Sequence, residues 1–352
     1  MEVIPYSRQT ITAEDESAIS SVLQSDYITR GPVTRKLEDA LCQLTQKKHC
    51  VVVSNGTLAL WAAFRAMHGD KIVTSTLTFG GVASAALLLG MDVFFSDVDF
   101  ETLCAEFEMS LYAEELIYVP MDYGGYPSLR HKLSFPTVLD ACHSIGATID
   151  GVSNTVFADI AVGSGHAIKQ ITGAELGWLV TDSDEYAASL REIRDVGRRD
   201  GKFYSVSLNL HTSEVSAGLY LSQLNRLPGN LNRRREIAHG YYSAFGQDLR
   251  LILPVDDPGH AWHLFVLRIS DVVNCSTDQF RSDLLELGVG TQKHYYPIHL
   301  QPLFASRNES FPIAEHAYER MISIPMYHGL TDQQQEKVIE AISIVLDRYS
   351  KG

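Results

Sequence analysis

The sequence predicts an α/β fold, in which helices cover both faces of a mostly parallel seven-stranded sheet, followed by a smaller α+β domain. Up to about residue 230, short apolar runs alternate with longer segments of helical periodicity, which is typical of a parallel sheet. After that point the alternation stops, and shorter strand-like runs precede a terminal helical pattern. We therefore expect a large domain over residues 1–230 and a small C-terminal domain over residues 231–352.

The expected elements of the large domain follow one another along the chain. A helix over Gln9–Ser25 contains the capping-like segment Thr12–Asp15. Later, a long helix over Ser213–Tyr242 should break around Pro228-Gly229. Between these helices, the apolar runs predict seven strands, centred near Val51, Ile72, Val93, Ile117, Val138, Ile160 and Trp178.

Three segments define the expected small domain. The runs HLFVLRI, beginning at His263, and GTQKHYYPI, beginning at Gly290, have the composition of strands. The segment Thr331–Tyr349 has the apolar spacing of a terminal helix. Strands and helices that do not alternate regularly favour an α+β arrangement for this part of the chain.

Composition excludes several classes of protein. The net charge of −14 argues against nucleic-acid binding, and we expect the basic cluster Arg233–Arg235 to be a solvated helix face. No apolar run approaches the roughly 20 residues that a membrane span needs. The N-terminus lacks the basic and apolar regions of a signal peptide.

The cysteines point to a reducing compartment. The chain has five of them, an odd number without CxxC spacing, so we expect neither disulfides nor a metal site, and a cytoplasmic location. Cys142 is the cysteine nearest to the candidate site residues, and a small buried side chain is its ordinary interpretation.

A buried strand, Cys50–Val53, is followed by the small-residue turn Ser54–Thr57 and then by a helical pattern. Strand, turn and helix in this order offer free backbone N–H groups and the positive end of the helix dipole to a phosphate. An ordinary connection between a strand and a helix would have the same pattern. Phe79, which follows the next strand, could stack on a flat cofactor ring or belong to the core.

Asp140 ends an apolar run, and Lys169 follows the block Ser-Gly-His-Ala-Ile, which begins at Ser164. A lysine amine can hold pyridoxal phosphate as a Schiff base, and a carboxylate can keep the cofactor's pyridine nitrogen protonated. Ser164 could place a hydroxyl on the cofactor phosphate. A surface lysine and a helix-capping aspartate are the ordinary alternatives. In such folds ligands bind beyond the carboxyl ends of the strands, where all these residues are expected.

Motifs along the whole chain resemble the DegT/StrS-type family of pyridoxal-phosphate-dependent sugar-nucleotide aminotransferases, which have the aspartate aminotransferase type I fold. The similar blocks, in chain order, are IPYSRQTI, SDYITRGP, SNGT, DACHSIGA, SGHAIKQIT, LNLHTSEVSAGLYLSQL, KHYYPIHLQPLF and ISIPMYHGLT. The opening YSRQTI, the HAIK-x-IT block and HYYPI look most like family members of the pseudaminic-acid pathway.

This resemblance implies a role for each matching residue. Lys169, Asp140 and His143 would be catalytic: the Schiff-base lysine, the partner of the pyridine nitrogen, and a group against the cofactor ring or its O3′. The other cofactor-binding residues would be Phe79 on the ring, Gly56, Thr57 and Ser164 on the phosphate, and Asn209 on the phosphate of a neighbouring subunit. The sugar-nucleotide site would be lined by Tyr6, Asp26, Tyr27, Ile28, Thr29, Lys293, His294, Tyr295 and Tyr296.

The implied reaction moves an amino group from glutamate to C4 of a UDP-4-keto-6-deoxy-N-acetylhexosamine, in a homodimer with shared active sites. A dTDP-linked or 3-keto sugar is an alternative substrate. Family members that dehydrate their substrate are expected to replace the lysine with histidine, which the presence of Lys169 disfavours. A pyridoxal-phosphate-binding regulator without turnover is an alternative from another class.

The chain also departs from the family pattern. His211 stands at a usual arginine, Leu176 at the first glycine after the lysine block, and Gly165 at an aromatic residue. Two segments look shortened: one around Glu101–Ile117, and one over Met121–Ala141, where a helix seems to be trimmed. These changes avoid the cofactor chemistry but affect expected substrate contacts and the subunit interface.

Overall fold

A computed structural model describes residues 3–107 and 116–349 of the chain. Strands form at all seven positions where the sequence predicts them in the first part of the chain. They are β1 (His49–Val53), β2 (Lys71–Ser75), β3 (Asp92–Ser96), β4 (Leu116–Val119), β5 (Val138–Asp140), β8 (Ile160–Ser164) and β9 (Gly177–Thr181).

The seven strands are divided between two sheets rather than forming the single sheet that we expected. One sheet has the order β1-β9-β8-β5 and the other β3-β2-β4. Isolated parallel bridges, Tyr118 to Thr137 and Met121 to Asp140, connect β4 with β5. Pairing is parallel except at β9, which runs antiparallel to both β1 and β8.

Helices pack on both faces of the strands, as predicted. Alternate residues of β1 belong to different cores: Val51 and Val53 lie in one, Cys50 and Val52 in the other, because successive side chains of a strand point to opposite faces. The first core contains α3 (Gly56–Met67), α4 (Gly81–Leu87) and α5 (Asp184–Arg194), and the second contains α2 (Pro32–Thr45) and α6 (Glu214–Leu224).

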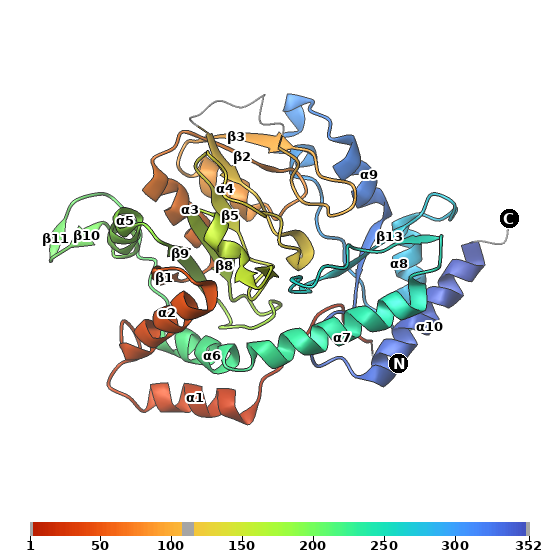
Figure 1. Ribbon diagram of the computed structural model, residues 1–352, viewed down its shortest axis with the longest axis horizontal. Helices are drawn as coiled ribbons and strands as arrows, with labels where there is room; N and C mark the ends of the chain where they lie inside the picture. The colour runs from red at the N-terminus through yellow and green to blue at the C-terminus, as the bar shows by residue number, and fades with distance from the viewer. Residues whose placement is uncertain (1–2, 108–115, 350–352) are drawn as a thin grey trace.

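The predicted terminal helices of this part form with shifted ends. The first, α1, spans Ala13–Leu23 and begins after Thr12, whose N–H donates to Asp15 over 3.0 Å. The long helix is broken between α6 and α7 (Leu227–Phe245), before the predicted break, and Pro228 lies in the first turn of α7. Proline is compatible with that position, because the first N–H groups of a helix have no intrahelical partner. Figure 1 shows α7 running from α6 toward α10 (Asp332–Tyr349).

The C-terminal part has its own antiparallel sheet and core. The sheet has the order β12-β13-β14, and its core includes residues of α7 and α10. The predicted terminal helix is α10, and the predicted strand in HLFVLRI is β13. The remaining bounds are β12 (Leu251–Ile252), β13 (Phe265–Ile269), β14 (Met321–Ile324), α8 (Thr277–Glu286) and α9 (Pro312–Arg320). The predicted domain boundary at residue 230 falls inside α7 and stays a prediction.

The predicted strand in GTQKHYYPI does not form. Only Gln292 makes an isolated bridge, to Ser323, and Ile298–Leu300 is a short 3-10 turn, η4. Pro297 has no N–H to donate to a ladder, and the N–H of Ile298 donates over 2.8 Å to Thr76, which follows β2. The segment therefore crosses to the first part of the chain instead of extending the C-terminal sheet.

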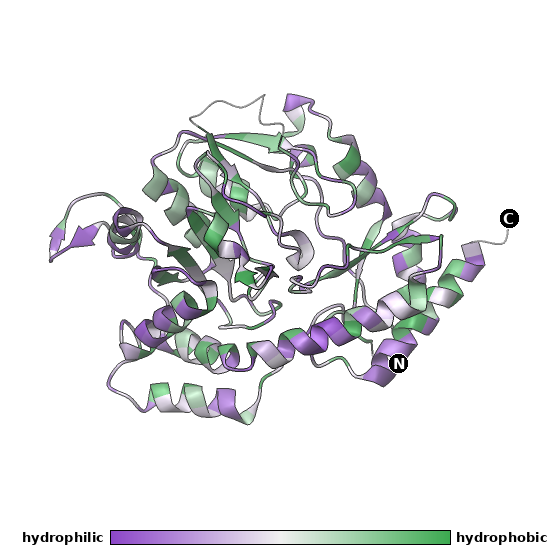
Figure 2. Cartoon of the chain, viewed as in Figure 1, coloured by the Kyte–Doolittle hydropathy of each residue, from purple (hydrophilic) through white to green (hydrophobic). Residues whose placement is uncertain are grey.

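Short elements complete the described chain. They are the hairpins β6 (Thr148–Ile149) with β7 (Val152–Ser153) and β10 (Arg198–Arg199) with β11 (Lys202–Phe203), and the 3-10 turns η2 (Tyr123–Gly125), η3 (Asn154–Phe157) and η5 (Ala305–Arg307). The hairpin β10–β11 projects from the body of the protein and is hydrophilic, whereas the central strands are largely hydrophobic (Figures 1 and 2).

Between β4 and β5 the described chain has the turn η2 and no α-helix, in agreement with the predicted trimming. Of the other segment predicted to be short, residues 108–115 lie outside the described residues. Within 3–107 and 116–349, no helix is both long and apolar enough to cross a membrane. The same residues contain no group of three or more His, Cys, Asp or Glu side chains placed to hold a metal ion.

Candidate active site

A cavity of about 570 Å³ lies beyond the carboxyl ends of the first strands, a size typical of small-molecule sites. All predicted cofactor residues except Asn209 line it. The lining consists of Asn55, Gly56, Thr57, Leu58, Leu60, Phe79, Met121, Asp140, Cys142, His143, Ser164, His166, Ile168, Lys169, Glu175, His294 and Tyr295.

One end of the cavity is the N-terminus of α3. The helix begins at Gly56, two residues earlier than its apolar pattern predicts, and the Asn55 side chain accepts the N–H of Leu58 over 2.9 Å. This cap leaves the N–H groups of Gly56 and Thr57 outside the intrahelical ladder. Ser164, the last residue of β8, closes the same corner, where a Cβ on Gly56 would contact its side chain. The corner has the donors, dipole and free space that a phosphate needs.

Lys169 and Asp140 lie in the same cavity. Burial lowers the pKa of the Lys169 amine, and Cys142 and Asp140 partly oppose this change. Burial raises the pKa of Asp140, against hydrogen bonds from Cys142 and the charge of Lys169. The Cys142 backbone N–H donates to the Asp140 carboxylate over 3.1 Å. Burial thus favours the uncharged amine, which is the form that attacks an aldehyde.

Aromatic and imidazole rings form another wall of the cavity. His143 is fully buried in the turn after β5, and its Nε2 lies 3.0 Å from the hydroxyl of Tyr295. The Tyr295 ring also lies 5.9 Å, centroid to centroid, from Phe79, which is 58% exposed. The exposed ring of Phe79 at the cavity, rather than in the core, is available to stack on a flat ligand.

The predicted sugar-nucleotide residues separate into two groups in the C-terminal part. His294 and Tyr295 line the cavity, and the ring of Tyr6 contacts His294 at 5.4 Å. In contrast, the Lys293 ammonium donates to Thr277 over 3.0 Å and lies over the Tyr318 ring. Tyr296 also packs against Tyr318, so the structure does not bring Lys293 or Tyr296 to the cavity.

The predicted residues Asp26–Thr29 and Asn209 do not line the cavity either. They are exposed, and the backbone links Thr29 to Ser213 through an isolated bridge. The Asn209 side chain accepts the N–H of His211 over 3.3 Å. These residues lie on the outer surface of the chain, where another molecule could reach them.

His211 belongs to a charged group on that surface. Its Nε2 lies 3.2 Å from Asp195, and the same carboxylate oxygen accepts from Arg30 over 3.0 Å. Arg198 binds the other oxygen of Asp195 at 2.9 Å. Asp195 therefore binds three side chains. Burial alone would raise the pKa of Asp195, but the hydrogen bonds from Arg198 and His211 and the charge of Arg30 outweigh burial and lower it.

Sequence reasoning missed several residues that line the cavity. His166 and Glu175 pair at 3.7 Å, and both are substantially exposed. His166 lies in the block that carries Lys169, and Glu175 follows shortly after that block, so their spacing around the lysine could have indicated them. Met121 gave no such signal, because nothing in its local pattern distinguishes it from a core methionine.

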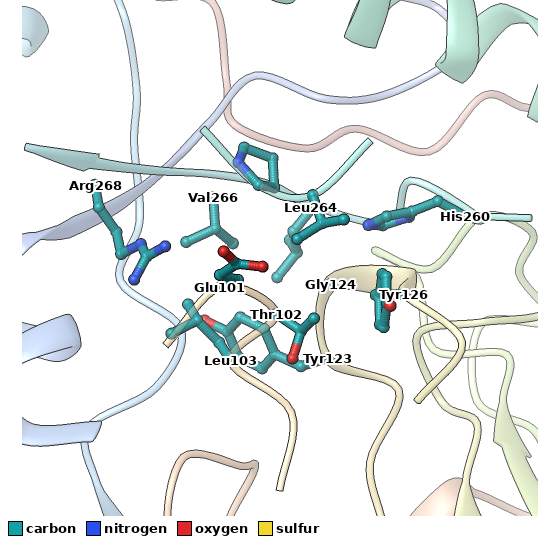
Figure 3. A pocket seen from close by; sticks show the side chains of 12 residues that line it. Glu101, Thr102, Leu103, Tyr123, Gly124, Tyr126, His260, Leu264, Val266 and Arg268 are labelled. Carbon is teal, nitrogen blue, oxygen red and sulfur yellow. The ribbon is translucent and has the colours of Figure 1, made fainter. Parts of the chain in front are cut away.

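A second pocket lies between the loop Glu101–Leu103, the turn η2 and strand β13 (Figure 3). Its volume of about 20 Å³ corresponds to about one water molecule. Arg268 lies on one side and donates to the carbonyl of Phe100, so the pocket belongs to a packed junction between the two parts of the chain.

Comparisons with known proteins agree with this geometry. Helicobacter pylori PseC, an aminotransferase involved in the biosynthesis of pseudoaminic acid, is 25% identical with a TM-score of 0.92 over 99% of this chain and 100% of that one. The aminotransferase TlmJ from Streptoalloteichus hindustanus is 25% identical with a TM-score of 0.92, over 98% and 99% of the two chains. The putative sugar aminotransferase Spr1654 from Streptococcus pneumoniae, in its PLP-form, has the same fold at 22% identity, with a TM-score of 0.91 over 99% of each chain.

The match to a protein family covers nearly the whole chain. The sequence pattern of the DegT/DnrJ/EryC1/StrS aminotransferase family matches residues 9–117 and 119–343. The amine of Lys169, the carboxylate of Asp140 and the N-terminus of α3 line one cavity, and their chemistry fits the aldehyde, the pyridine nitrogen and the phosphate of pyridoxal phosphate, respectively. The chain belongs to the DegT/DnrJ/EryC1/StrS aminotransferase family, and pyridoxal phosphate is its cofactor.

Proposed function

We propose that the protein transfers an amino group from glutamate to C4 of a UDP-linked 4-keto-6-deoxy-N-acetylhexosamine, in the manner of pseudaminic-acid biosynthesis. The observation that carries the transaminase assignment is the meeting of Lys169, Asp140 and the N-terminus of α3 in one cavity. The similarity to PseC over the full length of both chains supports the sugar class.

Bound pyridoxal phosphate supplies the electron sink, and the protein supplies orientation and proton transfer. Lys169 holds the cofactor at Nζ and, once released, carries a proton at the same atom. Its lowered pKa keeps a larger share of the amine uncharged and able to accept that proton. Asp140 holds a proton at the pyridine nitrogen, and the N–H of Cys142 keeps the carboxylate in place.

The sugar side of the cavity would be formed by the segment around His294. His294, Tyr295 and the neighbouring Tyr6 offer hydrogen-bonding groups and flat rings for a sugar nucleotide. At the mouth, Glu175 and His166 are exposed and can meet a polar substrate. Lys293 is held by Thr277 and Tyr318, so it contributes to this site only if its side chain is released.

The exposed residues outside the cavity favour a homodimer with shared sites. Tyr27 and Ile28 are 56% and 57% exposed, and Val206 is 88% exposed. Exposed apolar side chains that lie together are typical of surfaces that another chain covers, and Asp195 joins these segments through its ion pair with Arg30 and its bridge to Asn209. In a two-fold dimer, Asn209 and the segment Asp26–Thr29 would then serve the cavity of the partner subunit.

Chemical labelling tests the cofactor assignment. Borohydride reduction of the cofactor-loaded protein, followed by peptide mapping, should place the pyridoxyl mass on the peptide that contains Lys169. Label on a different lysine would remove Lys169 from its role. Adding glutamate to the unreduced protein should change its visible absorption, whereas a regulator without turnover would show no release of 2-oxoglutarate.

A substrate panel tests the sugar. UDP- and dTDP-linked 4-keto and 3-keto sugars are incubated with glutamate, and the aminated products are measured by mass. We expect the highest rate with the UDP-linked 4-keto-6-deoxy-N-acetylhexosamine. A clear preference for the dTDP series or for 3-keto sugars would reject this substrate and leave the aminotransferase assignment intact.

A further inference from the structure

Tyr295 and His143 form a hydrogen-bonded pair that joins the two parts of the chain at the cofactor cavity. The imidazole Nε2 and the phenol oxygen lie 3.0 Å apart, although the residues are 152 positions apart in the sequence. His143 follows strand β5, and Tyr295 lies in the segment that crosses from the C-terminal part to β2. The pair therefore exists only when the two parts of the chain are packed together.

Burial favours the uncharged form of both members of the pair. Burial raises the pKa of Tyr295 well above its ordinary value, and the neighbouring Tyr123, Asp140 and Cys142 add to this effect. Burial lowers the pKa of His143 well below its ordinary value, as does the charge of Lys169. The phenol keeps its proton and the imidazole carries a single proton, so one of the two residues donates and the other accepts.

The surrounding buried atoms indicate which residue donates. Nδ1 of His143 and Oε1 of Gln170 are both buried without a hydrogen-bond partner among the described residues. The side-chain nitrogen of Gln170 donates to the backbone carbonyl of His143. This hydrogen bond holds the Gln170 side chain beside His143. If Nε2 carried the proton and donated to Tyr295, the phenol proton would need a second acceptor, and among the described residues the Tyr295 hydroxyl has no hydrogen-bond partner other than His143.

We propose that Tyr295 is a positioning residue for His143: its hydroxyl donates to Nε2, and it thereby holds the imidazole in the Nδ1–H form beside the cofactor. Ring contacts assist, since His143 also packs against His263 at 4.3 Å and Tyr295 against Phe79 at 5.9 Å. Tyr295 thus couples the C-terminal part of the chain to the cofactor site. The inference rests on the proposed transaminase site, but not on the identity of its sugar.

Nitrogen NMR of cofactor-free protein tests the inference without any activity. In histidine-labelled protein, with His143 assigned from the signals lost in His143→Asn, Nε2 should have the shift of an unprotonated nitrogen and Nδ1 that of a protonated one. Tyr295→Phe keeps the ring but removes the donor, and we expect the ratio of the two tautomers to move about tenfold toward Nε2–H. Tyr241→Phe is the matched control, because it removes the hydroxyl of a buried tyrosine that donates to Pro325 over 2.7 Å.

Two results would overturn the proposal: a wild-type His143 protonated at Nε2, or unchanged His143 shifts in Tyr295→Phe. The wild-type spectrum alone decides the tautomer if the variant does not fold. As a second readout, Tyr295→Phe should weaken cofactor binding about three- to tenfold, whereas Tyr241→Phe should not change it. If no sugar in the panel is aminated, the proposed substrate fails, but the NMR result still confirms or rejects the role of Tyr295.

Discussion

A Cβ atom added to Gly56 would lie 3.1 Å from the Cβ of Ser164, so the first residue of α3 and the last residue of β8 nearly touch. The same Cβ would lie 3.2 Å from the sulfur of Cys142. These contacts are tight enough that neighbouring atoms would have to move. The closeness brings the N-terminus of a helix and a serine hydroxyl to one corner of the cavity, which is where a phosphate would bind.

Gly56→Ala should therefore weaken pyridoxal phosphate binding. We expect the dissociation constant to rise about tenfold, because the methyl group displaces Ser164 and Cys142 from the phosphate corner. Titration of the cofactor-free protein, followed by absorbance, measures the effect. Gly229→Ala in α7 is the control, since its Cβ would meet open space, and it should leave binding unchanged. Equal affinity of Gly56→Ala and wild type would remove this corner from phosphate binding.

Asp140→Asn should keep the fold and much of the bound cofactor but lower turnover about a hundredfold or more. The amide oxygen can still accept the N–H of Cys142, which holds the side chain in place. The amide cannot keep the pyridine nitrogen protonated, so stabilisation of the developing charge is lost. Stopped-flow absorbance with glutamate measures the half-reaction, and a variant with a near wild-type rate would contradict the role of Asp140.

Mixing two inactive variants tests the shared active sites. In the proposed homodimer, Lys169→Ala disables a subunit's own cavity and Asn209→Ala disables the cavity of its partner. Refolding the two together should form mixed dimers with one intact site each, and restore about a quarter of the wild-type activity. Mixing Lys169→Ala with Asp140→Asn is the control, because both changes damage a subunit's own cavity and every site stays defective. Absence of recovery in the first mixture, with dimers present by light scattering, would reject the shared site.

Stability should fall as the pH drops below about 6.5. Burial lowers the pKa of His260 and His294 to about 3 and of His328 to about 4. Their unfolded forms bind protons near pH 6.5, so each can remove about 1.4 kcal/mol of unfolding free energy per pH unit below that value. Asp122 acts in the opposite direction, since burial raises its pKa to about 6 and its contribution is lost as the pH rises. The raised pKa of Asp140 acts in the same direction as that of Asp122, but the lowered pKa values of His143 and His263 add to the effect of the three histidines.

Denaturant unfolding of the cofactor-free protein at pH 7.5 and 5.0 measures this dependence. His260→Asn should have a shallower pH profile, because the amide can accept the N–H of Trp262, as Nδ1 of His260 does over 2.8 Å, but does not titrate. The difference in unfolding free energy between the wild type and His260→Asn should decrease by about 2 kcal/mol when the pH is lowered from 7.5 to 5.0. Parallel profiles for the two proteins would show that His260 does not titrate as proposed.

Arg226 should matter more for stability than an exposed cation does. Its guanidinium lies 2.7 Å from the side chain of Asp15, which is fully inaccessible to solvent, and so ties α1 to the start of α7. Arg226→Leu would leave the Asp15 carboxylate buried without its cation, and we expect a loss of about 2 kcal/mol. Lys48→Ala breaks the exposed pair with Asp184 and should change the unfolding free energy much less, because solvent screens that pair. Adding Asp15→Asn to Arg226→Leu should recover part of the loss.

The sequence by itself determined the positions of the strands and of the residues at their ends. Gly56, Asp140, Ser164 and Lys169 follow apolar runs or small-residue turns, and these patterns depend on neighbours within a few positions. Because the carboxyl ends of parallel strands lie at one edge, correct strands were enough to place these residues in one cavity. That these residues lie together could therefore be predicted without the fold, whereas their roles toward the cofactor stay predictions.

Only the tertiary structure decided which partners the side chains of the C-terminal part meet. Lys293, His294 and Tyr295 are consecutive residues of one motif, but their side chains have different surroundings. The Lys293 ammonium donates to Thr277, whereas His294 and Tyr295 line the cavity. No local pattern distinguishes them, because their partners lie up to 152 positions away and depend on how one part of the chain packs on the other. The same reason explains the failed strand at Gly290–Ile298, whose last N–H binds Thr76 across that junction. Local propensity determines the backbone conformation where its hydrogen bonds join nearby residues. Tertiary packing determines it where the hydrogen bonds join residues far apart in the sequence.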